Sequence, residues 1–229
     1  RTRLVHATGR LFGLSMPQLD PAAAAVEMIH AYSLIHDDLP AMDNDALRRG
    51  KPTVHIAFDE ATAILAGDAL QALAYETLVR AEWPDAIKLA ALHELISASG
   101  SRGMCGGQQL DMDAGGKALN VADLQNVHAL KTGALIKAAI RLPAIVAGAD
   151  GDARVALDAF ADDLGLAFQI QDDILDVEAS TAQLGKSAGK DAAQAKATYP
   201  GLLGLDGAKA LLADLAERLP GISESAKIF

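Results

Sequence analysis

The chain has 229 residues and a net charge of −10, and 51% of its residues are hydrophobic while only 4% are aromatic. Non-specific nucleic-acid binding requires Lys and Arg at phosphates, so this acidic balance argues against a nucleic-acid partner. No apolar run reaches the ~20 residues of a membrane-spanning helix. The N-terminus does not resemble a secretory signal and the single thiol cannot form an internal disulfide, so we expect a soluble, cytoplasmic protein in which Cys105 is buried and structural.

Apolar residues recur at helical spacing along the chain, and Pro, Gly and Asp mark where the predicted helices begin and end. Asp20-Pro21 predicts an N-cap and a first-turn proline for a helix over 22–36, which ends before Pro40. The further predicted helices cover 59–81, 85 to about 99, 120 or 121 to 147 with a bend at Pro143, 152–177 and 207–218. No alternating run predicts a strand and no linker divides the chain, so we expect one all-α domain over 1–229. The first residue is Arg1 and not Met, which indicates an incomplete N-terminus.

Two acidic clusters interrupt strongly apolar helical segments. The first contains Asp37, Asp38, Asp43 and Asp45, and the second contains Asp172, Asp173 and Asp176. Charged side chains on apolar helical faces seldom serve packing, and oxygen ligands without His or Cys favour a hard cation such as Mg²⁺. The alternative is a solvated acidic helix end, but the flanks of the two clusters match, at 35–39 and 170–174, which favours a shared function.

Basic residues accompany both acidic clusters. They are Arg48, Arg49 and Lys51 after the first cluster, Lys186, Lys190 and Lys196 after the second, Lys131 between them, and Arg1 and Arg3 at the N-terminus. Each alone is typical of a surface charge or simple ion pair, but together with Mg²⁺ they suit a site for two diphosphate groups. A phosphate-binding Walker loop is excluded, because Gly185-Lys186-Ser187 has Ser180 where the loop needs a glycine.

Six segments occur together in one order. They are SLIHDDLPAMD at 33–43, RRGKPT at 48–53, GDAL at 67–70, GGQ at 106–108, KTG at 131–133 and FQIQDDILD at 168–176. In this combination the chain resembles the short-chain trans-prenyl diphosphate synthases, the family of farnesyl and geranylgeranyl diphosphate synthases, from Arg1 to about Leu205. The resemblance implies an antiparallel helical bundle around a deep central cavity, assembled as a homodimer. The segment 205–229 is shorter than the family pattern, which indicates an incomplete C-terminus as well.

The resemblance also implies the reaction, a Mg²⁺-dependent condensation of isopentenyl diphosphate with dimethylallyl or geranyl diphosphate that gives farnesyl diphosphate and releases diphosphate. Three Mg²⁺ ions would lie between the clusters, held by Asp37, Asp38, Asp43, Asp172, Asp173 and Asp176, with Asp38 and Asp173 in supporting roles. The catalytic residues would be Lys131, Thr132, Gln169, Asp37 and Asp172. The substrate-binding residues would be Arg1, His30 and Arg49 for isopentenyl diphosphate, and Arg48, Lys131, Thr132, Gln169, Lys186 and Lys196 for the allylic diphosphate.

Two residues that precede Asp37 on the same predicted helix, His30 and Tyr32, are further candidates. His30 lies seven residues before Asp37 and therefore on the same helical face, although a lone His on an apolar helix is often a core residue. Tyr32 lies five residues before Asp37, about 7.5 Å along the helix, where its ring would close the cavity floor at fifteen carbons. Ordinary core packing is the alternative for Tyr32, and the small Ser33 leaves a twenty-carbon product open.

Four other functions are alternatives to a farnesyl diphosphate synthase. A geranylgeranyl diphosphate synthase is the nearest, and a terpene cyclase is disfavoured because the second cluster is Asp172-Asp173-Ile174-Leu175-Asp176. A non-catalytic helical subunit that regulates a partner synthase is disfavoured because both clusters are intact. An oxygen-activating di-metal bundle would need Glu-x-x-His pairs, which the sequence lacks.

Overall fold

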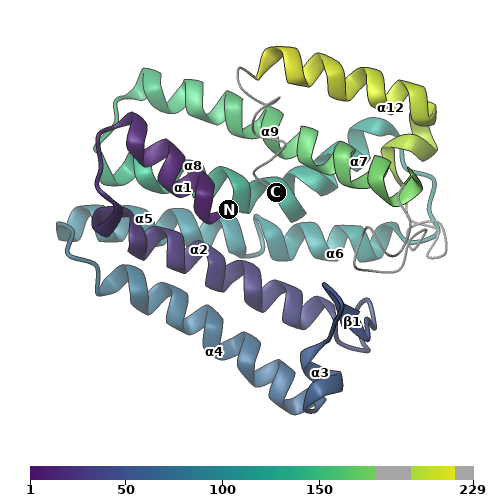
Figure 1. Ribbon diagram of the computed structural model, residues 1–229, viewed down its shortest axis with the longest axis horizontal. Helices are drawn as coiled ribbons and strands as arrows, with labels where there is room; N and C mark the ends of the chain where they lie inside the picture. The colour runs from purple at the N-terminus through teal and green to yellow at the C-terminus, as the bar shows by residue number, and fades with distance from the viewer. Residues whose placement is uncertain (179–196, 220–229) are drawn as a thin grey trace.

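The computed structural model describes residues 1–178 and 197–219, and these residues are almost entirely helical (Figure 1). The helices are α1 (Thr2–Leu11), α2 (Met16–Asp37), α3 (Val54–Ala57), α4 (Glu60–Val79), α5 (Asp85–Ser99), α6 (Met104–Ala114), α7 (Val121–His128), α8 (Ala134–Val146), α9 (Gly151–Glu178) and α12 (Tyr199–Arg218). A π-helical turn, η1, covers Ala129–Gly133, and strands β1 (Leu47–Arg48) and β2 (Lys51–Pro52) form a short antiparallel hairpin. Within the described ranges, no helix has both the length and the hydrophobicity to cross a membrane.

Helix α8 is the central element of the bundle. Most of its residues are buried and apolar, and its two charged residues, Lys137 and Arg141, pair with Asp162 and Asp158 of α9. Leu135, Ala139 and Leu142 pack in one core with residues of α1, α2, α4 and α5, whereas Ile136 and Ile140 pack in a second core with residues of α7, α9 and α12. Figure 1 shows α2 beside α4 on one side of α8, and α9 with α12 on the other. The predicted all-α single bundle is therefore confirmed.

Helix α2, which carries the first acidic cluster at its end, begins earlier than predicted. Its first residue is Met16 and not Ala22, because the Gln18 side chain accepts hydrogen bonds from the backbone N–H and hydroxyl of Ser15 at 2.9 and 2.8 Å. This pairing resembles half of a capping box and satisfies a backbone N–H that the helix start would leave unpaired. Pro21 therefore lies inside α2, near enough to the start that only one backbone hydrogen bond is lost.

The segment predicted as one bent helix over 120–147 is three consecutive helical pieces, α7, η1 and α8. The irregularity is the wide turn of η1, and Pro143 lies inside α8. π-Helical turns are rare and frequently occur at functional sites. The bend predicted at Pro143 is therefore wrong. The departure from α-helical geometry occurs earlier, at Lys131-Thr132-Gly133.

Helices α5 and α9 match their predicted ranges within one residue, and α4 begins after Asp59, whose carboxylate accepts a hydrogen bond from the Thr62 N–H. Helix α12 starts eight residues before the predicted position, because Gly204 adopts a positive φ of 73° and the chain continues as helix on both sides of this kink. Helices α1 and α6 were not predicted. Both are short and contain glycine, which weakens the helical pattern.

The hairpin after the first acidic cluster was also not predicted. Its register pairs Leu47 with Pro52 and Arg48 with Lys51, so the turn consists of Arg49 and Gly50 alone. Both turn residues have positive φ, 53° and 74°, as a type I′ turn requires. Arg at the first turn position is unusual, and the sequence therefore lacks the Asn-Gly signal by which such turns are found.

Candidate active site

The first acidic cluster is held together by the turn that follows α2. Asp37 is the last residue of the helix, and its backbone carbonyl accepts a hydrogen bond from the Asp43 N–H at 2.9 Å. The Asp45 N–H likewise donates to the Asp38 carbonyl at 3.1 Å. The backbone thus folds back on itself and brings the four acidic residues into one turn.

Asp38 and Arg48 form a buried pair beside this turn. Asp38 is 3% exposed, and Arg48 donates to its carboxylate through Nε at 2.9 Å and Nη2 at 2.6 Å. A forked arginine contact of this kind fixes the orientation of both groups. The geometry supports the prediction that Asp38 has a supporting role, and it shows that Arg48 already has a carboxylate partner.

Helix α6 connects the first cluster to η1. Gln108 donates a hydrogen bond from Nε2 to the Asp37 carboxylate at 2.6 Å, and Asp111, one helical turn further on, accepts one from Lys131 Nζ at 2.7 Å. The backbones approach closely here, because a Cβ added to Gly107 would lie 2.6 Å from Lys131 Cα. Asp111 was not singled out from the sequence, although its spacing from Gln108 places both on one helical face.

The second cluster is connected to η1 through Thr132. The Thr132 hydroxyl donates to Gln169 Oε1 at 3.2 Å, and Gln169 Nε2 donates to the Asp173 carboxylate at 2.8 Å. The other Asp173 oxygen accepts from the Tyr199 N–H at 2.9 Å, where α12 begins. Asp173 is 3% exposed, so its two oxygens serve the protein framework, as the predicted supporting role requires. Asp172, on the same turn of α9, is only half-buried.

Two consecutive residues of one π-helical turn are therefore connected to the two clusters indirectly. Lys131 bonds Asp111 of α6 and lies in the field of Asp37 and Asp43, and Thr132 bonds Gln169, which holds Asp173. Burial lowers the tendency of Lys131 to be charged, but the Asp111, Asp37 and Asp43 carboxylates outweigh burial and raise its pKa. One ammonium among three carboxylates leaves an excess of negative charge, and oxygen donors suit Mg²⁺ in character. The donors thus fit this cation, although among the described residues no three acidic, His or Cys side chains form a preassembled metal site.

A basic group lies beside the first cluster. Burial, followed by the charges of Arg1, Arg49 and Arg48, lowers the pKa of His30 to about 3, which places these cations around the His30 ring. Burial also lowers the pKa of Arg1 to about 10, despite the nearby Glu27 carboxylate. The Arg1 Nε is buried and has no hydrogen-bond partner within the described part of the chain. The structure thus brings together the three residues predicted for isopentenyl diphosphate.

Tyr32 lies further back on α2 and is 5% exposed. Its hydroxyl is 3.5 Å from Cys105 Sγ, and its ring packs edge-on against His36 at a centroid distance of 5.7 Å. The prediction that Cys105 is buried is wrong, because this residue is exposed in the first turn of α6 although its sulfur contacts Tyr32. Ser33 Oγ donates to the His30 carbonyl at 2.8 Å and is therefore tied to its own helix.

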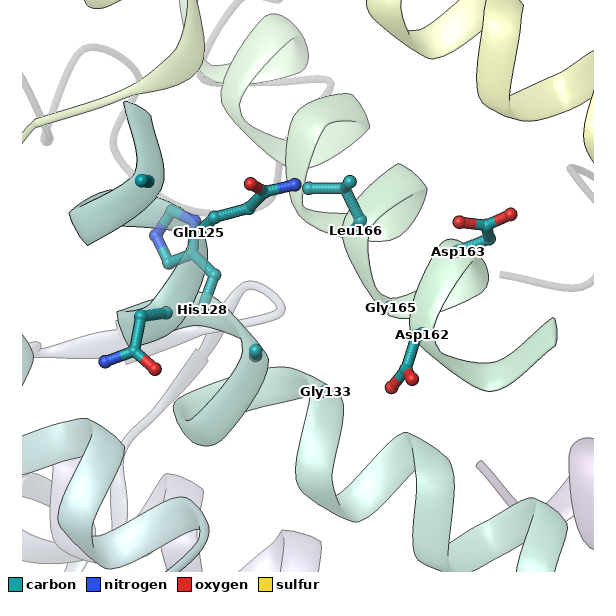
Figure 2. Close-up of a pocket in the computed structure, with 10 residues that line it drawn as sticks. Gln125, His128, Gly133, Asp162, Asp163, Gly165 and Leu166 are labelled. Atoms are coloured by element: carbon teal, nitrogen blue, oxygen red, sulfur yellow. The ribbon is translucent and has the colours of Figure 1, made fainter. Parts of the chain in front are cut away.

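A cavity of about 380 Å³ lies between α7 and α9 and is separate from these residues (Figure 2). Figure 2 shows Gln125 and His128 on one side and Asp162, Asp163 and Leu166 on the other. Its lining contains no residue of either acidic cluster and neither Lys131 nor Thr132, so it is not the candidate active site. Lys186 and Lys196 lie outside the described residues, and the deep central cavity remains a prediction.

The chain matches the Polyprenyl synthetase family over residues 1–226. It is 57% identical to the farnesyl diphosphate synthase of Escherichia coli over 221 residues, which is 95% of this chain and 74% of that enzyme. Among solved structures it resembles an FPP/GFPP synthase from Zymomonas mobilis, with a TM-score of 0.85 and 40% identity over 98% of this chain and 76% of that one. It also resembles a geranyltransferase from Helicobacter pylori complexed with magnesium and isoprenyl diphosphate, with a TM-score of 0.82 and 38% identity over 88% of this chain and 66% of that one.

Proposed function

Because this chain belongs to the polyprenyl synthetase family, we propose that it is a trans-prenyltransferase that makes farnesyl diphosphate. The reaction joins isopentenyl diphosphate to dimethylallyl or geranyl diphosphate and releases diphosphate. The observation that carries the proposal is that the two clusters act on consecutive residues. The Asp37 and Asp43 charges raise the pKa of Lys131, and Thr132 bonds Gln169, which in turn holds Asp173. A leaving diphosphate at η1 would thereby be reached from both clusters at once.

The proposed metal-binding residues are Asp37 and Asp43 on one side and Asp172 and Asp176 on the other, with three Mg²⁺ ions bound together with the substrate. When bound, Mg²⁺ would neutralise charge on the diphosphate leaving group. The Helicobacter pylori relative was solved with magnesium and an isoprenyl diphosphate, which supports this part of the proposal. Asp176 is 6% exposed, so its carboxylate would bind a metal ion from a nearly buried position.

The isopentenyl diphosphate would bind at Arg1, His30 and Arg49. With a pKa of about 3, His30 is uncharged near neutral pH and would offer a ring N–H as a hydrogen-bond donor, while the two arginines supply the charge. The buried, unpartnered Nε of Arg1 supports an anionic ligand here, because a polar atom without a partner is costly in the interior.

The allylic diphosphate would bind against Lys131, Arg48 and Gln169, with Lys186 and Lys196 as further proposed contacts. Its C–O bond breaks, and the double bond of isopentenyl diphosphate supplies the electron pair of the new C–C bond. The proton that the adduct loses passes to the released diphosphate. Thr132 and Gln169, which bond each other, would stabilise positive charge near the breaking bond.

Chain length would be limited by Tyr32, with the small Ser33 beside it. The Tyr32 ring is almost fully buried, packs edge-on against His36 and has its hydroxyl beside Cys105, so it would act as a barrier. This supports a fifteen-carbon product. A geranylgeranyl diphosphate synthase is the alternative, and a ring that moved aside would favour it.

The protein would act as a homodimer. Large apolar side chains are exposed along α4 and α5, which pack against each other; they are Ile64, Leu65, Leu73, Val79, Leu89 and Ile96. An apolar surface over two adjacent helices is typical of an interface and supports a second copy as its partner. A Leu65→Lys variant should sediment as a monomer. A cytoplasmic location stays a prediction.

The experiment that tests the function mixes the protein with Mg²⁺, labelled isopentenyl diphosphate and geranyl diphosphate, and measures both diphosphate release and product length. We expect a labelled fifteen-carbon product. Asp37→Asn should lower turnover at least about a hundredfold, since loss of one metal ligand would remove several kcal/mol of the stabilisation that the metal gives to the leaving diphosphate. The matched control is Asp20→Asn, on the surface of the same helix, which should leave turnover unchanged. A protein that binds these substrates but releases no diphosphate would support the non-catalytic subunit instead.

A further inference from the structure

Helix α6 places two side chains between the first acidic cluster and the π-helical turn. Gln108 holds the Asp37 carboxylate at 2.6 Å, and Asp111 holds the Lys131 ammonium at 2.7 Å. The side chains of Asp111 and Lys131 are only 15% and 22% exposed, so this ion pair is largely shielded from water. Neither Gln108 nor Asp111 has a role in the function proposed above.

The Lys131 ammonium has more than one carboxylate within reach. The Asp37 and Asp43 charges act on it strongly enough to raise its pKa together with Asp111. An ammonium that moved onto Asp37 or Asp43 would occupy oxygens that a divalent cation needs, because a cation and an ammonium compete for the same lone pairs. The hydrogen bond keeps the ammonium on Asp111, a carboxylate of α6 that belongs to neither acidic cluster.

We propose that Asp111 is a positioning residue that keeps the Lys131 ammonium paired with its own carboxylate and not with Asp37 or Asp43, so that Asp37 and Asp43 can bind a divalent cation while Lys131 remains available to the diphosphate. The inference rests on the proposed function, because it presumes that Asp37 and Asp43 bind metal. It goes beyond that function in assigning α6 a part in metal affinity. Asp111 acts through Lys131 and need not contact the substrate.

The test measures binding of Mn²⁺ alone, without substrate or diphosphate, to the purified protein by electron paramagnetic resonance. With Asp111→Asn, the dissociation constant for Mn²⁺ should rise about tenfold, the effect of losing one charge-assisted hydrogen bond. The matched control is Asp113→Asn, which makes the same chemical change on the same helix at an exposed residue that pairs with Gln109. Mn²⁺ binding by the control should match that of the unsubstituted protein.

A double-variant cycle separates positioning from a simple loss of negative charge. In a Lys131→Gln background there is no ammonium to misplace, so adding Asp111→Asn should change Mn²⁺ affinity less than twofold. An equal loss of affinity with and without Lys131 would overturn the proposal, because Asp111 would then act on the metal directly. Unchanged Mn²⁺ binding by Asp111→Asn alone would also overturn it.

Asp111→Ser is a second neutral replacement, with a smaller side chain, in case Asp111→Asn destabilises the fold. Whichever variant unfolds at the same temperature as the unsubstituted protein should show the same loss of Mn²⁺ affinity. If the unsubstituted protein binds Mn²⁺ only when inorganic diphosphate is present, the same comparison is made in its presence. Failure to bind Mn²⁺ both alone and with inorganic diphosphate would contradict the proposed metal site itself. A loss of binding confined to the Asp111 variants tests only the present inference. In turnover assays, the Asp111 variants should need about tenfold more Mg²⁺ for half-maximal rate, with little change in the KM for isopentenyl diphosphate.

Discussion

The contact between Gly107 and η1 gives the sharpest prediction. A Cβ at position 107 would lie 2.6 Å from Lys131 Cα and 2.7 Å from the Leu130 carbonyl carbon, and closer still to the Lys131 nitrogen. Ordinary contacts of this kind are about 3.5–4 Å, so Gly107→Ala requires the two backbones to separate by about 1 Å. Both partners are backbone atoms, and no rotamer change can relieve the overlap.

The displacement should affect stability and catalysis differently. Overpacking of this size costs about 1–3 kcal/mol of unfolding free energy, whereas moving Lys131 and Thr132 by about 1 Å can lower turnover about a hundredfold. Urea unfolding and steady-state diphosphate release measure the two effects. Gly151→Ala is the control, because Gly151 opens α9 with nothing near its added Cβ, and it should stabilise the protein by about 0.5 kcal/mol. Full turnover and stability in Gly107→Ala would refute the close packing of α6 on η1.

Three further predictions concern other parts of the chain. Arg49→Asn should raise the KM for isopentenyl diphosphate in steady-state assays while leaving stability unchanged or higher by about 0.5 kcal/mol, since Asn suits a positive φ in a type I′ turn; a lower unfolding temperature would contradict this. Tyr32→Ala should lengthen the product from fifteen toward twenty carbons on chromatography, and an unchanged product would defeat the barrier argument while leaving catalysis intact. The hydrogen bond from Arg141 holds the pKa of Asp158 below its usual range, so this pair stabilises the fold above about pH 4 and the contribution is lost as pH falls through the depressed value. Asp158→Asn should therefore lower the unfolding temperature at pH 7 but much less at pH 3.

The sequence predicted the long regular helices well, because α5 and α9 have clear apolar periodicity and clear boundaries. It failed where the backbone departs from regular geometry. The positive φ of Arg49 is concealed by a residue type that seldom adopts it, and the π-helical turn at Lys131 leaves no mark in the pattern of apolar residues.

The candidate site likewise contains features that the sequence predicted and features that it did not. Acidic and basic residues could be found from composition and resemblance, but their pairing could not. The forked contact of Arg48 with Asp38 and the bond from Asp173 to the Tyr199 N–H depend on the folding of the turn after α2 and on the start of α12. Asp111 was missed because a single Asp on an amphipathic helix is indistinguishable from a solvated surface charge. Cys105 was placed wrongly because burial of a thiol depends on the local path of α6.

The most direct test of the account compares turnover of Asp37→Ala, Asp172→Ala and the double variant. If both acidic clusters act on one leaving group, each single substitution should remove nearly as much activity as the pair, because residues that act as a unit are strongly non-additive. Undiminished turnover in the double variant would contradict a shared site. So would losses that multiply independently, since they would mean that the two clusters work apart.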